Sequence, residues 1–385
     1  MALQTCFSRA GTAGSRSVLV HALAVFTAFL CFPVLICHFA LPSIGFVIGW
    51  HTRQHCGLRI APNKHWESSR KLLKDQMATT EILSSLATEQ QNLASQALDT
   101  KSALEIATII NNEDAKVAGA VRKALPQIAR AIDAVADALA RGGRLIYVGT
   151  GTSGRVAALD ASECPPTFST DPKLVQFVIA GGERALAHAT EASEDSVKLG
   201  ERDVAKLRPG KKDVVIGIAA SGRTPYTIAA VEYAKKKGAK TFAVVCNAGT
   251  PLGEAAETAI IAEVGAEVLS GSTRMKAGSA QKMILNMITT GAMTRLGYVY
   301  GNLMVNVSLK NTKLYERAVS ILSKAAGVDR EQATRAIERS GKSVPVALIM
   351  LKTGASRAEA ARRLKTAKGN VRKAIESTGS AKPSV

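Results

Sequence analysis

Two short turns, rich in glycine and in hydroxyl side chains, constrain the fold of this chain most strongly. They are Gly149–Arg155 (Gly-Thr-Gly-Thr-Ser-Gly-Arg) and Ala220–Tyr226 (Ala-Ser-Gly-Arg-Thr-Pro-Tyr). Each follows an apolar run that is typical of a strand and precedes a segment with the pattern of a helix. Such a turn gathers backbone N–H groups at a helix N-terminus, where the helix dipole favours an anion. We therefore expect both turns to hold a phosphate.

Neither turn matches a nucleotide-binding motif. No Gly-Lys-Ser/Thr follows either one, which argues against a Walker loop, and no acidic residue closes a following strand as a ribose ligand would. Two hydroxyl-rich turns suit a sugar phosphate better than a nucleotide, although either turn alone could be purely structural. The candidate phosphate ligands are Thr152, Ser153, Ser221, Arg223 and Thr224.

Short apolar runs alternate with helical patterns along the middle of the chain. The expected strands are Leu145–Val148, Leu174–Ala180, Val214–Ala219, Thr241–Cys246 and Ala259–Val264. The expected helices between them are Val156–Ala161, Ala185–Lys206, Pro225–Lys237 and Gly253–Glu257. This alternation predicts an α/β fold with a mostly parallel sheet and helices on both faces. The ligand crevice of such a sheet lies at the carboxyl ends of its strands, where both turns fall.

The first 76 residues differ in composition from the rest of the chain. Residues 17–52 contain no charged side chain, and Val18–Trp50 is long enough to cross a bilayer. A membrane anchor and a targeting segment are two interpretations. We favour a third, in which translation starts at Met77 and residues 1–76 lie outside the native fold. The expected domains are then 77–327 and 328–385.

The C-terminal region is basic and helical. Val328–Val385 carries 13 Lys and Arg against 5 Asp and Glu, within a chain of net charge +19. It lacks the aromatic residues that accompany nucleic-acid binding, so we expect a solvated basic surface and no nucleic-acid partner. Three helical patterns predict a small, UBA-like appendage: Arg330–Ser340, Val344–Leu351 and Arg357–Lys365. Beyond residue 76, the two cysteines Cys164 and Cys246 have neither disulfide nor metal spacing, which fits the reducing cytoplasm.

Two glutamates are candidate acid–base residues. Glu163 follows the first turn and precedes Pro165 and Pro166, which we expect to end the helix and hold Glu163 in a rigid corner near the ligand. Glu194 belongs to a second acidic cluster, Glu191–Asp195. The alternative for either glutamate is a solvated side chain on the surface.

A third polar stretch precedes the long helix expected over Lys276–Leu296. It places Ser272, Thr273 and Lys276 at the helix N-terminus, again a favourable position for binding an anion. A structural helix cap by Ser272 or Thr273 is the alternative, and one side chain could serve both roles. The apolar stripe of this helix (Met283, Ile284, Met287, Ile288 and Met293) is typical of a core or a dimer interface.

These motifs, in this order, resemble the N-acetylmuramic acid 6-phosphate etherase family, which has the SIS (sugar isomerase) fold and is related to the glucokinase regulatory protein. The resemblance runs from about Leu93 to Ile375. Besides the two turns, it rests on Asp160–Thr167 (Asp-Ala-Ser-Glu-Cys-Pro-Pro-Thr) and Gly265–Lys276 (Gly-Ala-Glu-Val-Leu-Ser-Gly-Ser-Thr-Arg-Met-Lys). It implies an SIS-type three-layer sandwich.

The resemblance also implies an activity and roles for residues. The reaction would cleave the lactyl ether of N-acetylmuramic acid 6-phosphate to give N-acetylglucosamine 6-phosphate and D-lactate, in the recycling of cell-wall sugars. Glu163 would be the proton donor and Glu194 the base, without a metal or redox cofactor. A homodimer with its site at the subunit interface is expected. A sugar-phosphate isomerase and a non-catalytic sugar-phosphate regulator are the competing functions.

Overall fold

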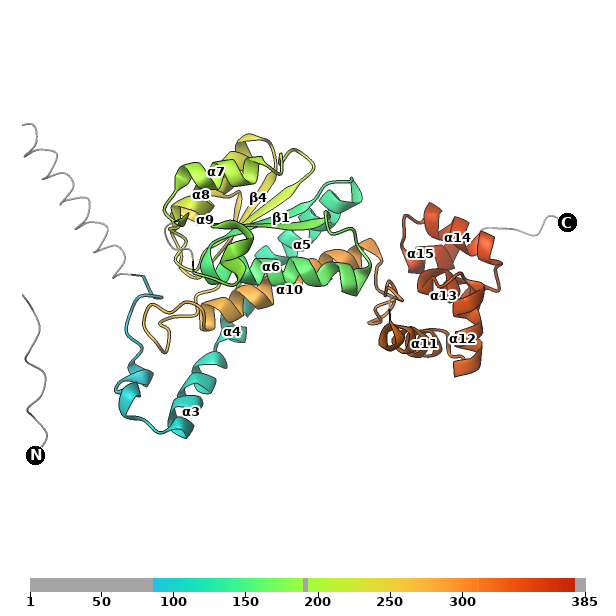
Figure 1. Ribbon diagram of the computed structural model, residues 1–385, viewed down its shortest axis with the longest axis horizontal. Coiled ribbons are helices and arrows are strands. Elements are labelled where there is room, and N and C mark those ends of the chain that lie inside the picture. Colours follow the sequence, from blue (N-terminus) through green and yellow to red (C-terminus); the bar gives the residue numbers. More distant parts are fainter. Residues whose placement is uncertain (1–85, 190–192, 310, 378–385) are drawn as a thin grey trace, which may run out of the picture. The chain divides into compact units, whose positions relative to one another are not determined.

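The computed structural model describes residues 86–189, 193–309 and 311–377 (Figure 1). The expectations for residues 1–76 fall outside these ranges. Within them, no helix combines the length and the apolar character that a membrane crossing requires.

A five-stranded parallel sheet forms the centre of the fold. Its strands are β1 (Leu145–Gly149), β2 (Val175–Ile179), β3 (Val214–Ile218), β4 (Lys240–Val245) and β5 (Thr258–Ile261). The order across the sheet is β2-β1-β3-β4-β5, and every neighbouring pair is parallel. All five strands match the apolar runs expected from the sequence to within a few residues.

Helices cover both faces of the sheet, because alternate strand residues point to opposite sides. Leu145 and Tyr147 of β1 pack in a core cluster with one helical layer, while Ile146 and Val148 pack in a cluster with the other. Figure 1 shows the two layers. The first contains α5 (Leu125–Ala140), α6 (Gly151–Phe168) and α10 (Lys276–Leu296); the second contains α7 (Val197–Ala205), α8 (Pro225–Lys236) and α9 (Pro251–Ala255).

The segment before the sheet is helical. It comprises the short 3-10 helices η2 (Leu93–Ser95) and η3 (Leu98–Thr100), then α3 (Ala103–Asp114) and α4 (Val117–Lys123). Pro126 lies in the first turn of α5, where a proline is tolerated because the N–H group that it lacks would have no partner within the helix. A further 3-10 helix, η4 (Gly182–Leu186), follows β2, so the single helix expected over 185–206 is wrong.

The C-terminal region has a hydrophobic cluster of its own. Its helices are α11 (Thr312–Ala326), α12 (Arg330–Arg339), α13 (Val344–Thr353), α14 (Arg357–Thr366) and α15 (Val371–Glu376). The three expected helices are confirmed as α12, α13 and α14. The cluster also takes in α11, ahead of the boundary expected at residue 328, because Leu322 on α11 and Ile337 on α12 are both buried in it.

The expectation that two prolines end the helix after Glu163 is wrong. Helix α6 continues through Pro165 and Pro166 to Phe168 and ends where Ser169 adopts a left-handed conformation (φ 53°). The prolines remove two N–H donors only in the last turns of the helix. Burial of Cys164 and Phe168 in the main core cluster holds these turns in place. Glu163 therefore lies on a helix and not in a loop corner.

Candidate active site

The two glycine-rich turns lie side by side at the carboxyl edge of the sheet. Strands β1 and β3 are neighbours, and the last residue of β1, Gly149, is in register with the last residue of β3, Ile218. The chain leaves these two strands toward opposite edges of the sheet, because β2 lies outside β1 and β4 lies outside β3. Open α/β sheets bind their ligands at this kind of switch point.

The first turn leads directly into α6. Gly151 has a positive φ of 48°, and the N-cap residue Thr150 makes no side-chain capping bond. The first N–H groups of the helix therefore have no side-chain cap and can donate hydrogen bonds to an anion. Ser153 is buried in this turn, and Thr152 is half-buried. Both predicted ligands thus lie in the first turn of α6.

The second turn has the same construction at the start of α8. The N-cap residue Thr224 also makes no side-chain capping bond. Gly222 has a φ of 67° and packs so closely that a Cβ there would lie 2.4 Å from the Thr250 hydroxyl oxygen. Ser221 Oγ accepts a hydrogen bond from the Arg223 N–H group (3.3 Å). The three predicted ligands Ser221, Arg223 and Thr224 are all half-buried here.

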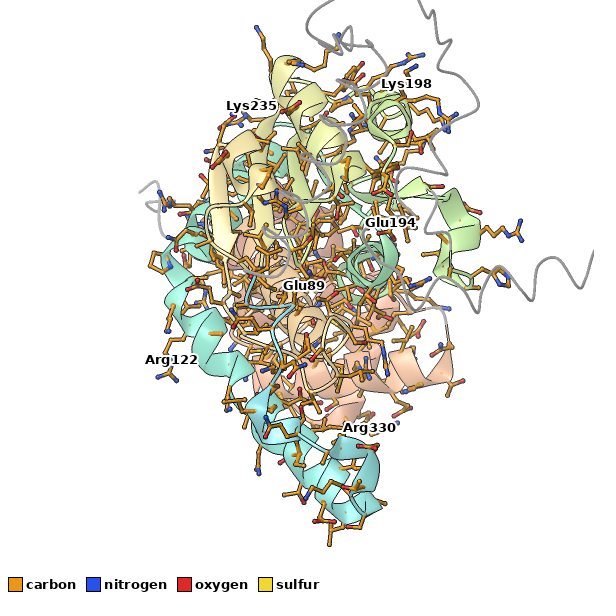
Figure 2. The ribbon with its side chains drawn as sticks, turned by 90° about the vertical axis from the view of Figure 1, so that its left-hand side faces the viewer. Glu89, Arg122, Glu194, Lys198, Lys235 and Arg330 are labelled. Carbon is orange, nitrogen blue, oxygen red and sulfur yellow. The ribbon has the colours of Figure 1, made fainter. Side chains whose placement is uncertain are left out.

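Glu194 connects the two turns. Its backbone oxygen accepts a hydrogen bond from the N–H group of Tyr226, in the first turn of α8 (3.1 Å). Its carboxylate lies against the first turn, since a Cβ at Gly151 would be 3.2 Å from Glu194 Oε1. Figure 2 labels this side chain beside the ribbon of α6. Of the two predicted acid–base residues, Glu194 is the one that lies next to both turns of its own chain.

Glu163 is placed differently. It is an exposed residue of α6, twelve residues beyond Gly151. A rise of 1.5 Å per residue separates the two positions by about 18 Å along the helix axis. The structure therefore does not bring Glu163 to the Glu194 carboxylate of the same chain.

The N-terminus of α10 contacts the first turn. A Cβ at Gly278 would lie 3.3 Å from the Thr152 side chain, and the Gly278 N–H group donates to Thr273 O (3.1 Å). Thr273 and its half-buried neighbour Ser272 thus belong to the same region as the two glycine-rich turns. Neither hydroxyl caps the helix, so the structural alternative considered for them is wrong.

The cap comes from a buried carboxylate that the sequence analysis missed. Glu267 is fully buried, and its two oxygens accept hydrogen bonds from the N–H groups of Lys276 (3.0 Å) and Ala277 (2.9 Å). A carboxylate at this position also interacts favourably with the helix dipole. The only sequence signal was an acidic residue nine positions before the helix.

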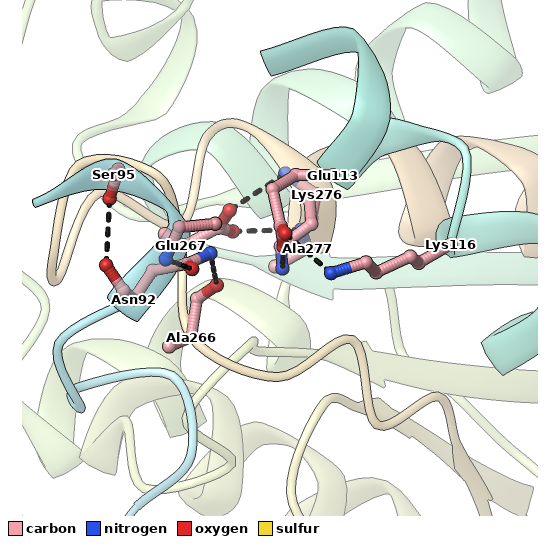
Figure 3. A network of polar contacts seen from close by, with 9 residues as sticks. Asn92, Ser95, Glu113, Lys116, Ala266, Glu267, Lys276 and Ala277 are labelled. Carbon is pink, nitrogen blue, oxygen red and sulfur yellow. Dashed lines mark hydrogen bonds and ion pairs between the residues drawn. The ribbon is translucent and has the colours of Figure 1, made fainter. Parts of the chain in front are cut away.

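Lys276 is buried in an ion pair (Figure 3). Its ammonium nitrogen lies 2.7 Å from Glu113 Oε2, and the other Glu113 oxygen pairs with Lys116. Burial alone would raise the pKa of Glu113, but hydrogen bonds from the two lysines and from Asn92 lower it to about 2. The partner of the Lys276 ammonium in this chain is thus Glu113, and its predicted contact with substrate stays a prediction.

A second buried carboxylate supports α6. Asp160, 4% exposed, accepts hydrogen bonds from Tyr147 of β1 (2.9 Å) and from Asn286 (2.6 Å) and Thr289 (3.1 Å) of α10. Burial raises the pKa of Asp160, although the three hydrogen bonds oppose the shift. The network fixes α6 against the sheet and α10. Sequence reasoning had placed Asp160 in a motif without giving it a role.

In the described ranges, no cluster of three or more His, Cys, Asp or Glu side chains has the geometry of a metal site. The thiols of Cys164 and Cys246 are buried and unpaired with each other, and burial raises the pKa of each to about 12. Neither thiol is poised for nucleophilic chemistry.

Three protein-family models match the chain. Residues 127–235 match the N-terminal SIS domain of the glucokinase regulatory protein, and residues 184–291 match the SIS domain. Residues 301–343 match the C-terminal lid domain of the glucokinase regulatory protein.

Curated relatives match over most of their own length. The N-acetylmuramic acid 6-phosphate etherase of Edwardsiella ictaluri is 50% identical over 294 residues, which are 76% of this chain and 98% of the relative. N-acetylmuramic acid 6-phosphate etherase 2 of Vibrio parahaemolyticus is 49% identical over 293 residues, with the same coverage. Among solved structures, a phosphoheptose isomerase from Francisella tularensis aligns with a TM-score of 0.38 and 20% identity, over 50% of this chain and 97% of that one.

Proposed function

The chain belongs to the N-acetylmuramic acid 6-phosphate etherase family and has its expected SIS fold, and from this premise we propose how its residues divide the work of the reaction. That reaction cleaves the ether between C3 of N-acetylmuramic acid 6-phosphate and its lactyl group. The observation that carries the proposal is the position of Glu194, which contacts both anion-binding turns at once.

The substrate phosphate binds between the two turns. The N-terminus of α6 has no side-chain cap and directs N–H groups to this edge of the sheet. The positive ends of the α6 and α8 dipoles point to the same edge, although the Tyr226 N–H group at the start of α8 already donates to Glu194 O. Thr152 and Ser153 on one side, and Ser221 and Thr224 on the other, add hydroxyl donors, while Arg223 adds a positive charge. These contacts anchor C6 of the sugar beside Glu194.

Glu194 removes the proton at C2 of the open-chain sugar. The aldehyde at C1 makes this proton acidic, and the electron pair released by its removal forms a double bond between C2 and C3 as the C3–oxygen bond breaks. Expulsion of the lactyl oxygen as a free alkoxide is prohibitive, so a protonated carboxyl group must donate to it. We assign that donation to Glu163. Positioned proton transfer contributes roughly 10²–10⁴-fold for each group.

The second half of the reaction adds water to the unsaturated aldehyde at C3. The same two carboxyl groups act with reversed roles, because Glu163 has given up its proton and Glu194 has gained one. The products are N-acetylglucosamine 6-phosphate and D-lactate. Glu163 gives a proton to the lactyl oxygen and regains one from the water, and Glu194 takes a proton from C2 and returns one to it.

Ser272 and Thr273 line the site next to the first turn. Thr273 supports this placement because it contacts the first turn of α10, which packs against Thr152. Lys276 acts by positioning these residues. Its ion pair with Glu113 and the Glu267 cap hold the N-terminus of α10 in position. We also propose that the active protein is a homodimer in the cytoplasm, where the free thiols of Cys164 and Cys246 remain reduced.

The test is an assay of D-lactate released from N-acetylmuramic acid 6-phosphate. We expect the full chain to release lactate, the Glu194→Gln variant to lose at least a hundredfold in kcat, and Glu232→Gln, an exposed change on α8, to match the parent. Binding of the substrate without lactate release would favour a regulator. Interconversion of an aldose and a ketose phosphate would favour an isomerase.

A further inference from the structure

The peptide group between Ala220 and Ser221, at the start of the second turn, is held by the loop that follows β4. Its carbonyl oxygen, on Ala220, accepts two hydrogen bonds, one from the N–H group of Cys246 (3.0 Å) and one from Asn247 Nδ2 (3.1 Å). Cys246 and Asn247 come directly after Val245, the last residue of β4. The two donors fix the direction of the Ala220 carbonyl group, which faces the β4 side of the turn.

The direction of this carbonyl group also sets the direction of the Ser221 N–H group. The peptide is trans and planar, so its C=O and N–H bonds point to opposite sides. Strand β3 lies between β4 and β1, and the Ser221 N–H group therefore points away from β4, toward the side where the first turn leaves β1. Among the described residues, no backbone or side-chain group accepts a hydrogen bond from it. A donor without a protein partner thus faces the space between the two turns.

The two hydrogen bonds on the Ala220 carbonyl oxygen should also strengthen this donor. Hydrogen bonds in a chain polarise one another, by roughly 10–30% per bond. A carbonyl group that accepts two of them makes the N–H group of the same peptide a better donor to an anion. Asn247 and Cys246 therefore support anion binding at Ser221 in two ways, by direction and by polarisation.

The Asn247 side chain reaches the turn from inside the protein, since the residue is only 4% exposed. Its Nδ2 atom donates a second hydrogen bond, to the hydroxyl oxygen of Thr88 (3.1 Å). Thr88 is fully buried and lies 159 positions earlier in the chain. Because both hydrogens of the amide are engaged, the side chain presents Nδ2, and not its oxygen, to the Ala220 carbonyl group. Thr88 thus fixes which end of the amide faces the turn.

Thr88 belongs to a segment, residues 86–92, that is anchored on both sides of it. After Thr88, Asn92 Nδ2 donates a hydrogen bond to Ala266 O in the loop before α10 (3.0 Å), as Figure 3 shows. Before it, the side chain of Leu86 is buried. These contacts give the Thr88 hydroxyl group a fixed position, so the amide that it orients is fixed as well.

We infer, on the basis of the proposed function, that Asn247 and Thr88 are positioning residues for the substrate phosphate. They orient the Ser221 N–H group toward the space between the two turns, where it donates a hydrogen bond to a phosphate oxygen. The N-terminal segment 86–92 is then part of the phosphate site, with Thr88 acting through Asn247. A purely structural tie between this segment and the sheet is the alternative, and it would affect stability alone.

Binding of N-acetylglucosamine 6-phosphate, measured by isothermal titration calorimetry, tests the inference without turnover. We expect Asn247→Ala and Thr88→Val each to raise its Kd by roughly 2- to 10-fold, the equivalent of one hydrogen bond. Thr88→Ser keeps the acceptor oxygen and should bind as the parent does. In the lactate assay, KM should rise in parallel and kcat should stay near that of the parent, because the phosphate contact is the same in the bound substrate and in the transition state.

Thr241→Val is the matched control. Thr241 is also fully buried, at the opposite end of β4, where its hydroxyl oxygen accepts a hydrogen bond from the N–H group of Glu257 (3.1 Å). This change should lower the free energy of unfolding in urea about as much as Thr88→Val does and leave Kd unchanged. If Asn247→Ala or Thr88→Val lowers stability and leaves Kd as in the parent, the contact is structural and the inference fails for that residue.

The same measurements separate this inference from the proposed function. A parent chain that binds the sugar phosphate and releases no lactate contradicts the etherase activity, whereas the expected order of Kd values would still support the two positioning roles. A parent chain that binds no sugar phosphate overturns both.

Discussion

Lys276 Nζ and Glu113 Oε2 lie 2.7 Å apart, and the two side chains are only 2% and 5% exposed. This buried ion pair joins the end of α3 to the start of α10, next to the cap formed by Glu267. The residues that hold α10 in place against the first phosphate turn thus come from segments far apart in the sequence.

Removing one partner of this pair should destabilise the fold strongly. Glu113→Gln leaves the Lys276 ammonium buried without its partner, and we expect it to lower the free energy of unfolding by about 3–5 kcal/mol. Lys276→Met should lower it by less, because the Glu113 carboxylate keeps its ion pair with Lys116. The double variant should lose less than the sum of the two, because it leaves neither of these charges unpaired. Urea unfolding of the parent and the three variants measures this coupling. Additive losses would show that the pair does not act as a unit.

The same carboxylate predicts a pH dependence of stability. The pKa of Glu113 falls from 4.5 to about 2 in the folded chain, so its contribution is fully present above pH 4.5 and is lost as the pH falls toward 2. Glu113→Gln should therefore weaken the dependence of the free energy of unfolding on pH between 4.5 and 2. The exposed change Glu232→Gln is the control and should leave that dependence as in the parent. An unchanged slope in Glu113→Gln contradicts the prediction.

The sequence could predict the elements that local patterns determine. The strands, the two turns and their place at the sheet edge follow from apolar runs and from glycine and hydroxyl spacing within a few residues. The Glu113–Lys276 pair could not be predicted in this way, because its partners are 163 residues apart. The predicted end of the helix at Pro165 and Pro166 was wrong for a related reason. The packing of Phe168 against distant helices outweighs the local tendency of two prolines to end a helix. That one error also concealed how far Glu163 lies from Glu194.

Asp160 should be essential for the placement of α6. Its carboxylate accepts hydrogen bonds from Tyr147, Asn286 and Thr289. Asp160→Ala removes the acceptor of the buried Tyr147 hydroxyl and of the half-buried Asn286 amide, whereas the Thr289 hydroxyl can still donate to Leu285 O. We expect a loss of about 3 kcal/mol in the free energy of unfolding. Asp160→Asn keeps one acceptor oxygen and should lose less. Thermal and urea unfolding distinguish the two, and equal losses would mean that the one amide oxygen of Asn does not replace the carboxylate as an acceptor.

Thr224 offers the clearest test of the phosphate site. It is the N-cap residue of α8, yet its hydroxyl makes no capping bond in the structure, so Thr224→Ala removes little that the fold needs. A hydrogen bond to a charged group contributes about 1.5–3 kcal/mol, which corresponds to a rise in the KM for the sugar phosphate of roughly 10- to 150-fold.

The matched control for Thr224 is Ser196→Ala. Ser196 Oγ does cap its helix, accepting from the N–H group of Leu199 (3.3 Å), and it lies outside the two phosphate turns. Loss of this cap should lower the free energy of unfolding by about 1 kcal/mol and leave KM unchanged. Thr224→Ala should show the reverse: a raised KM with little change in stability. If Thr224→Ala instead lowers stability and leaves KM as in the parent, the hydroxyl is structural and the phosphate binds without it.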